Sequence, residues 1–225
     1  MKRFLGAILP LTLMAAGCSQ PASALDKPVA APAAKRFANE GMGLKTAVFA
    51  GGCFWGVEAV FSHVKGVKSA VSGYHGGKSS TAKYDLVSSG MTNHTEAVKI
   101  TYDPKIVRYD ELLRIFFSVV ADPTLKNRQG PDRGAHYNAE LIPVNAEQRK
   151  VASAYLSQMQ ASGKWSGRIV TDITPYRAFY KAEAYHQDFA LKNPRHRYIV
   201  RWDAPKIAAL ERMYPKNYRS SFIRN

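Results

Sequence analysis

Apolar positions near the start of the chain predict a strand, a tight turn and a helix in succession. Residues 47–50 form an unbroken apolar run of strand type, and the run ends at Gly51 and Gly52. Helical spacing of apolar residues begins after these glycines, at Phe54, Val57, Phe61 and Val64. Cys53 therefore stands where the predicted turn becomes the predicted helix.

Similar patterns predict further strands and helices along the rest of the chain. We expect strands at 67–74, 94–102 and 169–173, and helices at 109–121, 146–159 and 203–213. Asn145 opens a capping box before one of these helices, and Asp203 is expected to cap the last. A chain of 225 residues is long enough for one good-sized core. We therefore expect a single α+β domain, in which helices flank a mixed β-sheet.

The strand at 94–102 places a carboxylate among apolar residues. Side chains alternate between the two faces of a strand, so Glu96 shares a face with Val98 and Ile100. Burial disfavours the charged form of a carboxyl group and raises its pKa, which makes Glu96 a candidate general acid. The alternative is a frayed strand end that leaves Glu96 in water.

Cys53 lies at the N-terminus of the predicted helix, where the helix dipole and free backbone N–H groups stabilise a thiolate. This placement predicts a lowered thiol pKa and a reactive cysteine. Gly52 would let a ligand or the backbone approach the sulfur closely. Most free cysteines are small buried apolar residues, and placement alone leaves that reading open.

Composition indicates a globular protein with a strongly basic charge. Hydrophobic residues make up 46% of the chain, and its formal net charge is +15. The positive charge is scattered and lacks the stacking aromatics of a nucleic-acid interface, so we expect a solvated surface and no nucleic-acid partner. The histidines lack metal-ligand spacing, so no metal site is expected.

The first residues read as an export signal. Lys2 and Arg3 precede an apolar stretch that ends at Gly17-Cys18, so residues 1–17 are predicted to be a signal peptide. Residues 14–18 resemble a bacterial lipoprotein signal, which implies lipidation of Cys18 and a periplasmic protein anchored to the outer membrane. An ordinary signal peptide cut nearby is the alternative. The Ala- and Pro-rich residues 18–44 then read as a tether, residues 45–215 as the domain, and residues 216–225 as a basic tail.

The number of cysteines favours a functional role for Cys53. The sequence holds two cysteines, Cys18 and Cys53, and lipidation would consume the first. Cys53 would then be a single free thiol in an exported protein. A free thiol is harmful there unless it has a function, so a functional Cys53 is favoured.

Residues 52–58, Gly-Cys-Phe-Trp-Gly-Val-Glu, resemble the active-site signature of the peptide methionine sulfoxide reductases of the A type. The resemblance extends from Lys45 to Pro194, and residues 179–189 resemble the family's late helix. It implies that Cys53 is the nucleophile, that Glu96 is the acid, and that Tyr84 and Tyr137 supply two hydroxyls. Phe54 and Trp55 would form a wall that binds the methyl group. The supporting residues would be Gly52, Asp132 and His186. A histidine satisfied within the structure is the alternative for His186.

The resemblance implies reduction of the S-epimer of methionine sulfoxide, free or in proteins, through a Cys53 sulfenic acid. No bound cofactor is expected, and the oxidised methionine and an external thiol are the expected partners of a monomer. Because the family's C-terminal recycling cysteines are missing here, we expect a thioredoxin-like protein or a small thiol to reduce Cys53 directly. An unlipidated Cys18 acting through the tether is one alternative for this step. A cysteine transferase and a non-catalytic lipoprotein binding module remain open as other functions.

Overall fold

A computed structural model describes residues 28–225, so the predicted signal peptide, Cys18 and the first part of the tether lie outside the described residues. The strands are β1 Lys45–Gly51, β2 Val67–His75, β3 Thr95–Tyr102, β4 Arg128–Gln129, β5 Asp132–Arg133, β6 Ala139–Ile142, β7 Asp172–Ile173 and β8 Phe179–Lys181. The α-helices are α1 Phe54–Ser62, α2 Tyr84–Ser88, α3 Tyr109–Ile115, α4 Ala146–Ala161, α5 Phe189–Lys192 and α6 Ala204–Met213.

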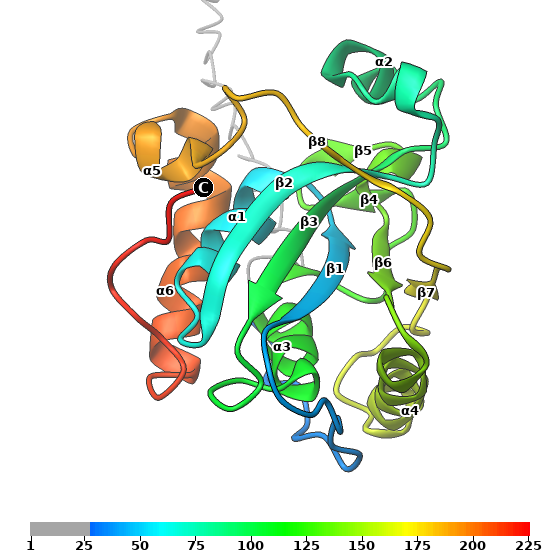
Figure 1. The fold of residues 1–225 in the computed structure, drawn as a ribbon, viewed down its shortest axis with the longest axis vertical. Coiled ribbons are helices and arrows are strands. Elements are labelled where there is room, and N and C mark those ends of the chain that lie inside the picture. The colour runs from blue at the N-terminus through cyan, green and yellow to red at the C-terminus, as the bar shows by residue number, and fades with distance from the viewer. Residues whose placement is uncertain (1–27) are drawn as a thin grey trace, which may run out of the picture.

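The main sheet is mixed, as the sequence predicted, and the α+β class is confirmed (Figure 1). Its six strands follow the order β7-β6-β1-β3-β2-β8. All neighbouring pairs are antiparallel except β6 and β7. β3 lies between β1 and β2, and its register places Glu96 opposite Tyr74 and Val98 opposite Phe49. The candidate acid is thus carried by a central strand, whose position both neighbours fix.

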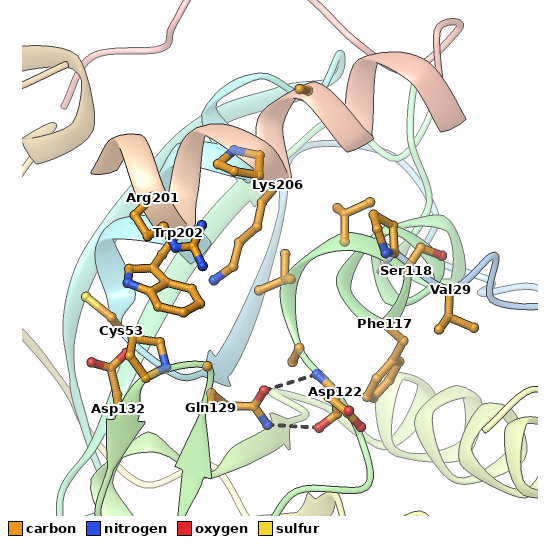
Figure 2. Close-up of a pocket in the computed structure, with 18 of the residues that line it drawn as sticks. Val29, Cys53, Phe117, Ser118, Asp122, Gln129, Asp132, Arg201, Trp202 and Lys206 are labelled. Carbon is orange, nitrogen blue, oxygen red and sulfur yellow. Dashed lines mark hydrogen bonds between the residues drawn. The ribbon is translucent and has the colours of Figure 1, made fainter. Parts of the chain in front are cut away.

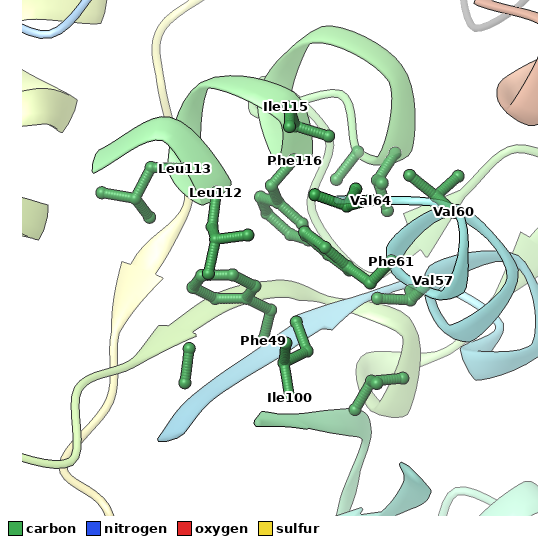
Figure 3. Close-up of a cluster of buried hydrophobic side chains, with 14 of the residues drawn as sticks. Phe49, Val57, Val60, Phe61, Val64, Ile100, Leu112, Leu113, Ile115 and Phe116 are labelled. Carbon is green, nitrogen blue, oxygen red and sulfur yellow. The ribbon is translucent and has the colours of Figure 1, made fainter. Parts of the chain in front are cut away.

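The core lies between this sheet and α1 and α3 (Figure 3). The Phe49 ring of β1 packs against Phe61 of α1 at 5.6 Å and against Phe116 at 5.2 Å, measured between ring centroids. The same ring lies 5.7 Å from Tyr109 of α3. These tilted aromatic contacts anchor α1 to the sheet, and α1 in turn positions Cys53 at its start.

The predicted helix at 109–121 has two parts. α3 ends at Ile115, and residues 116–120 form a π-helical turn in which the Ala121 N–H donates to the Phe116 carbonyl at 3.0 Å. The π-turn holds one more residue than an α-helical turn, and such turns are frequent beside functional sites. Here the segment after it, up to Asp122, forms part of a cavity wall.

The expectation of a late helix at 179–189 is wrong. Residues 179–181 pair with β2 as β8, and α5 begins only at Phe189. Gly73 of β2 explains the difference, because a Cβ there would lie 2.3 Å from the Tyr180 carbonyl oxygen. A glycine lets the second strand approach, and strand pairing then outweighs the local helical preference. The predicted strand at 169–173 shortens to β7.

The domain begins earlier than residue 45. Ala31 is 1% exposed and its N–H donates to Ser118 Oγ at 3.0 Å. The Ala38 N–H donates to Asp110 Oδ1 at 2.9 Å. The tether prediction is therefore wrong for the later part of residues 18–44, because small alanines fit closely and their backbone groups find partners. None of the described helices is both long and apolar enough to cross a membrane.

Residues 216–225, predicted as a basic tail, also pack on the domain. Ile223 is buried, and its N–H donates to the Ser62 carbonyl at 3.2 Å. The Asn225 amide reaches the Glu58 carboxyl at 2.9 Å, and its backbone N–H donates to Asp188 Oδ1 at 3.1 Å. Burial raises the pKa of Glu58 to about 7, because it disfavours the charged carboxylate. The last residues of the described chain therefore cover a buried acid and supply it with a hydrogen-bond donor.

Asn225→Ala should lower the free energy of unfolding by about 1–2 kcal/mol, because the Glu58 and Asp188 carboxyls lose a hydrogen-bond donor. Urea unfolding followed by circular dichroism measures this difference. The exposed neighbour gives a matched control, since Arg224→Ala should leave the urea midpoint unchanged. Equal midpoints for all three proteins would contradict a structural role for the last residues.

Candidate active site

Cys53 occupies the N-cap position of α1 and is 9% exposed. The turn before it needs glycine, because Gly52 has a φ of +84° and a Cβ there would lie 2.6 Å from the Gln129 side chain. The glycine accommodates the Gln129 side chain, and the expected approach of a ligand or the backbone to the sulfur stays a prediction. This turn fixes the sulfur between α1 and the β4–β5 hairpin.

Glu96 lies directly beside the start of α1. It is 1% exposed, and its Oε2 accepts a hydrogen bond from the Phe54 N–H at 2.9 Å. Burial, assisted by the nearby Asp132, raises the pKa of Glu96 to about 8, against the opposing effect of the Phe54 N–H. The expected burial is confirmed, and at neutral pH the carboxyl group holds a proton.

The thiol of Cys53 does not have the lowered pKa that its helix position predicted. Burial raises its pKa well above the ordinary value, and Glu96, Asp203 and Asp132 act in the same direction. The Trp55 N–H at the helix start opposes this change, but burial is the larger effect. The resting site therefore holds a neutral thiol beside a neutral acid.

Two tyrosines complete the polar group around Cys53. Tyr84 begins α2, and Tyr137 ends the 3₁₀ turn at residues 135–137. Burial, followed by the proximity of Glu96 and Cys53, raises the pKa of both hydroxyls, to about 12 for Tyr84. Their hydroxyls therefore stay protonated and available as hydrogen-bond donors. The fold brings all four predicted catalytic side chains together.

Glu183, which sequence reasoning did not single out, positions Tyr84. Its Oε1 accepts from the Tyr84 N–H at 2.9 Å, and its Oε2 accepts from the Tyr74 hydroxyl at 2.8 Å. Glu183 lies in the segment mistaken for a helix, and no sequence pattern pointed to this long-range pair.

Aromatic rings hold Trp55 at the edge of this group. Its indole stacks on Phe189 with ring centroids 3.7 Å apart, and its N–H donates to His186 Nδ1 at 3.1 Å. His186 is 1% exposed, and burial lowers its pKa, so it accepts as a neutral imidazole. His186 is therefore near the site. Its Nδ1 accepts from Trp55, but its buried Nε2 has no hydrogen-bond partner among the described residues, so the alternative of a histidine satisfied within the structure is wrong. Phe54 is 1% exposed and packs between Tyr74 and His186, so much of its surface serves as a core anchor.

The C-terminal segment adds residues that the sequence did not suggest. The Tyr198 hydroxyl donates to Asp132 Oδ2, and the Tyr198 ring meets Trp55 edge-on at 5.9 Å. Burial raises the pKa of Asp132, while Tyr198 and Lys206 oppose this shift. The sequence signal for this segment was the dense run of basic and aromatic residues at 195–202, which we interpreted as part of the solvated surface.

Asp203 does not cap the last helix as predicted, because its side chain makes no capping hydrogen bond. It is 0% exposed, and neither carboxyl oxygen has a hydrogen-bond partner within the described residues. The Lys206 ammonium lies 3.6 Å from Asp203 Oδ1. Burial raises the pKa of Asp203 to about 6, and the lysine opposes this change.

A cavity of about 500 Å³ opens on one flank of Cys53 (Figure 2). Its wall includes Asp132, Gln129, Trp202 and Lys206. Of the described residues, Glu96, Tyr84, Tyr137, Phe54 and Trp55 are not part of that wall. Of the four predicted catalytic residues, Cys53 alone lines this cavity, together with Asp132 and Tyr198.

Among residues 28–225, no three His, Cys, Asp or Glu side chains are placed to hold a metal ion. The chemistry that this arrangement supports is nucleophilic attack by the sulfur, assisted by an adjacent acid and two hydroxyls.

Comparison with known families gives one consistent result. The family described as peptide methionine sulfoxide reductase matches residues 45–218. Peptide methionine sulfoxide reductase MsrA 2 of Mesorhizobium japonicum is 48% identical over 176 residues, which cover 78% of this chain and 90% of that protein. The MsrA 2 protein of Synechocystis is 48% identical over 172 residues, which cover 76% of this chain and 80% of that protein.

Solved structures agree with this result. The crystal structure of reduced Mxr1 from Saccharomyces cerevisiae is 31% identical and superposes with a TM-score of 0.63, over 72% of this chain and 93% of that chain. Methionine sulfoxide reductase A of Corynebacterium diphtheriae is 33% identical with a TM-score of 0.59, over 68% of this chain and 77% of that chain.

Glu96 should make the folded protein less stable as the pH rises from about 4.5 to 8. Its folded pKa of about 8 exceeds the unfolded value, so the folded state binds more protons in this window and the free energy of unfolding falls with pH. Glu96→Gln, which mimics the neutral acid, should raise stability at pH 8.5 by on the order of 1–3 kcal/mol and leave pH 4.5 nearly unchanged.

Urea unfolding at the two pH values measures the effect. Glu211→Gln, at an exposed acid on α6, is the matched control and should track the wild type at both. A Glu96→Gln protein with the wild-type pH slope would show that Glu96 is ionised in the fold.

Proposed function

The chain belongs to the peptide methionine sulfoxide reductase family and reduces methionine sulfoxide to methionine, and we propose that Cys53 is its nucleophile and Glu96 its acid. The observation that carries this assignment is the buried Glu96 carboxyl beside Cys53, hydrogen-bonded to the Phe54 N–H at 2.9 Å. The comparisons give no support to a cysteine transferase or to a non-catalytic binding module.

The sulfoxide oxygen would lie among the Glu96 acid and the Tyr84 and Tyr137 hydroxyls, all of which carry protons to donate. Trp55, held by its stack on Phe189, would present an apolar surface to the S-methyl group, with Phe54 supporting it from the core. Burial of a methyl group against an aromatic ring favours it over a polar substituent. Because this arrangement is chiral, it would accept one epimer of the sulfoxide. We assign it the S-epimer, on the basis of the family resemblance.

Proton transfer from Glu96 to the sulfoxide oxygen would make the substrate sulfur electrophilic. The Cys53 sulfur then attacks that sulfur, and the oxygen passes to Cys53 as methionine leaves. The products are methionine and a Cys53 sulfenic acid, so the substrate sulfur gains two electrons and the cysteine sulfur loses two.

The neutral resting thiol determines when Cys53 can react. Once Glu96 has given its proton to the substrate, its carboxylate can accept the thiol proton of Cys53. One group would thus serve as acid and then as base, and a thiolate would form only beside a bound sulfoxide. The raised pKa values of both groups support this order of events.

We place the enzyme, as a monomer, in the periplasm. Residues 1–18 support export and lipidation of Cys18, and residues 19–27 would hold the domain near the outer membrane. An external thiol, from a thioredoxin-like protein or a small molecule, would reduce the sulfenic acid, because Cys53 is the one cysteine among the described residues.

A single turnover without reductant tests the chemistry. The wild-type domain with excess methionine sulfoxide peptide and dimedone should form about one methionine per chain and a dimedone adduct on Cys53, read by intact mass. Cys53→Ser should form none, and Glu96→Gln should slow the burst by on the order of 10²–10⁴-fold. Glu211→Gln is the control and should match the wild type. Full burst activity in Cys53→Ser would refute the assignment.

Cys18→Ser separates anchoring from recycling. In a cell that processes lipoproteins, this variant should move the protein from the membrane fraction to the soluble fraction. Purified Cys18→Ser protein should keep its thioredoxin-driven turnover unchanged, because Cys53 is recycled from outside. Lost turnover with an unchanged membrane fraction would instead make Cys18 the resolving cysteine.

A further inference from the structure

We propose that the cavity beside Cys53 binds a small thiol that carries carboxylate groups, and that this thiol reduces the Cys53 sulfenic acid. The inference rests on the proposed function, and it names the chemical class of reductant and its binding site. It does not depend on which methionine-containing proteins are the substrates.

The cavity has the size and lining of a small-molecule site. Its volume of about 500 Å³ falls within the roughly 300–1,000 Å³ typical of ligand pockets. Trp165, Trp202 and Phe117 supply apolar surface, and Cys53 lies in the same wall. A tripeptide-sized thiol would therefore fit while its sulfur reaches Cys53.

The charges in the wall favour an anion. Three cations, Arg201, Lys206 and Arg212, line the cavity together with two acids, Asp122 and Asp132. Both acids already have protein donors, since Asp122 Oδ1 accepts from the Thr124 N–H at 2.8 Å and Asp132 Oδ2 accepts from Tyr198.

The two arginines form fewer polar interactions within the protein than the acids do. Lys206 pairs with the buried Asp203, but within the described residues neither arginine forms a salt bridge. The Arg201 guanidinium lies over the Trp202 ring, 5.2 Å from its centroid, and remains exposed. Two exposed guanidiniums, one of them beside an indole ring, suit a ligand with carboxylates and a short aliphatic stem.

The position of the cavity suits displacement at the sulfenic sulfur. The oxygen left on Cys53 would lie toward Glu96 and the two tyrosines, none of which lines the cavity. A thiolate in the cavity would therefore approach the Cys53 sulfur from a side that these three residues do not occupy. Its sulfur bonds to the Cys53 sulfur, the S–O bond breaks, and the oxygen leaves as water after protonation from the Glu96 side.

A second thiol completes the cycle. It attacks the ligand sulfur of the mixed disulfide, releases the Cys53 thiol, and leaves a small-molecule disulfide. Two thiols are oxidised and one sulfenic acid is reduced, so the electrons balance. The 9% exposure of Cys53 favours a reductant that enters the cavity over one that must reach the sulfur from the outer surface.

Two-stage kinetics of the mature chain test the proposal. Stoichiometric methionine sulfoxide first converts Cys53 to the sulfenic acid, and methionine formation is quantified for every variant. Glutathione or 2-mercaptoethanol is then added, and loss of the dimedone-reactive sulfenic acid gives a second-order rate constant, corrected for the thiolate fraction. We expect glutathione to react faster than the neutral thiol and to lose this advantage in 0.5 M salt.

Arg201→Gln should lower the ratio of the glutathione constant to the 2-mercaptoethanol constant about fivefold. Adding Arg212→Gln should lower it further. Lys150→Gln removes an exposed lysine from α4, outside the cavity wall, and should keep both constants at their wild-type values.

Three results would overturn the proposal. One is a wild-type glutathione constant no larger than that of the neutral thiol. Another is an equal loss with both thiols in Arg201→Gln. The third is found by using an acidic methionine sulfoxide peptide in the first stage. If Arg201→Gln slows only that stage and neither thiol reaction, the cavity binds substrate. A normal methionine burst in the first two cases would leave the proposed function intact, whereas an absent burst in the wild type would overturn that function itself.

Discussion

The site depends on one hydrogen bond across two elements, from the Phe54 N–H at the start of α1 to the buried Glu96 carboxyl of β3. The central position of β3 fixes Glu96, and the aromatic core fixes α1, so neither partner can move without disturbing the sheet. A free N–H at a helix start needs an acceptor, and this acceptor is also the acid beside Cys53. The same contact that completes the helix therefore brings the proposed proton donor and the proposed nucleophile together.

A consequence is that the resting site is uncharged at its centre. Burial keeps Glu96 protonated and also keeps the Cys53 sulfur protonated. A neutral thiol reacts slowly with adventitious oxidants, and a neutral acid retains the proton that the sulfoxide needs. In the proposed mechanism, substrate binding then supplies the oxygen that takes the Glu96 proton, so reactivity is linked to occupancy of the site.

The local features of the site could be predicted from the sequence, and the long-range ones could not. Alternation in β3 indicated the burial of Glu96, and the glycines before Cys53 indicated a close turn, because both depend on neighbouring residues. The thiol pKa was predicted in the wrong direction, since a helix terminus is visible in the sequence while burial and the combined effect of Asp132 and Asp203 are not. Glu183 and Tyr198 reach the site only through tertiary packing, and residues 216–225 dock on the domain in the same way. β8 was mistaken for a helix because its pairing depends on Gly73, about a hundred residues earlier.

The docked ends of the described chain also bear on how the protein folds. The Ala31 bond to Ser118 spans 87 residues, and the Asn225 bond to Glu58 spans 167. Contacts between such distant residues form late and slow the folding of a domain. Phe189, which follows Asp188 in this network, can hold Trp55 only when most of the chain has been synthesised. Ribosome-bound chains would therefore carry an unfinished site, which is compatible with the export that we propose from residues 1–18.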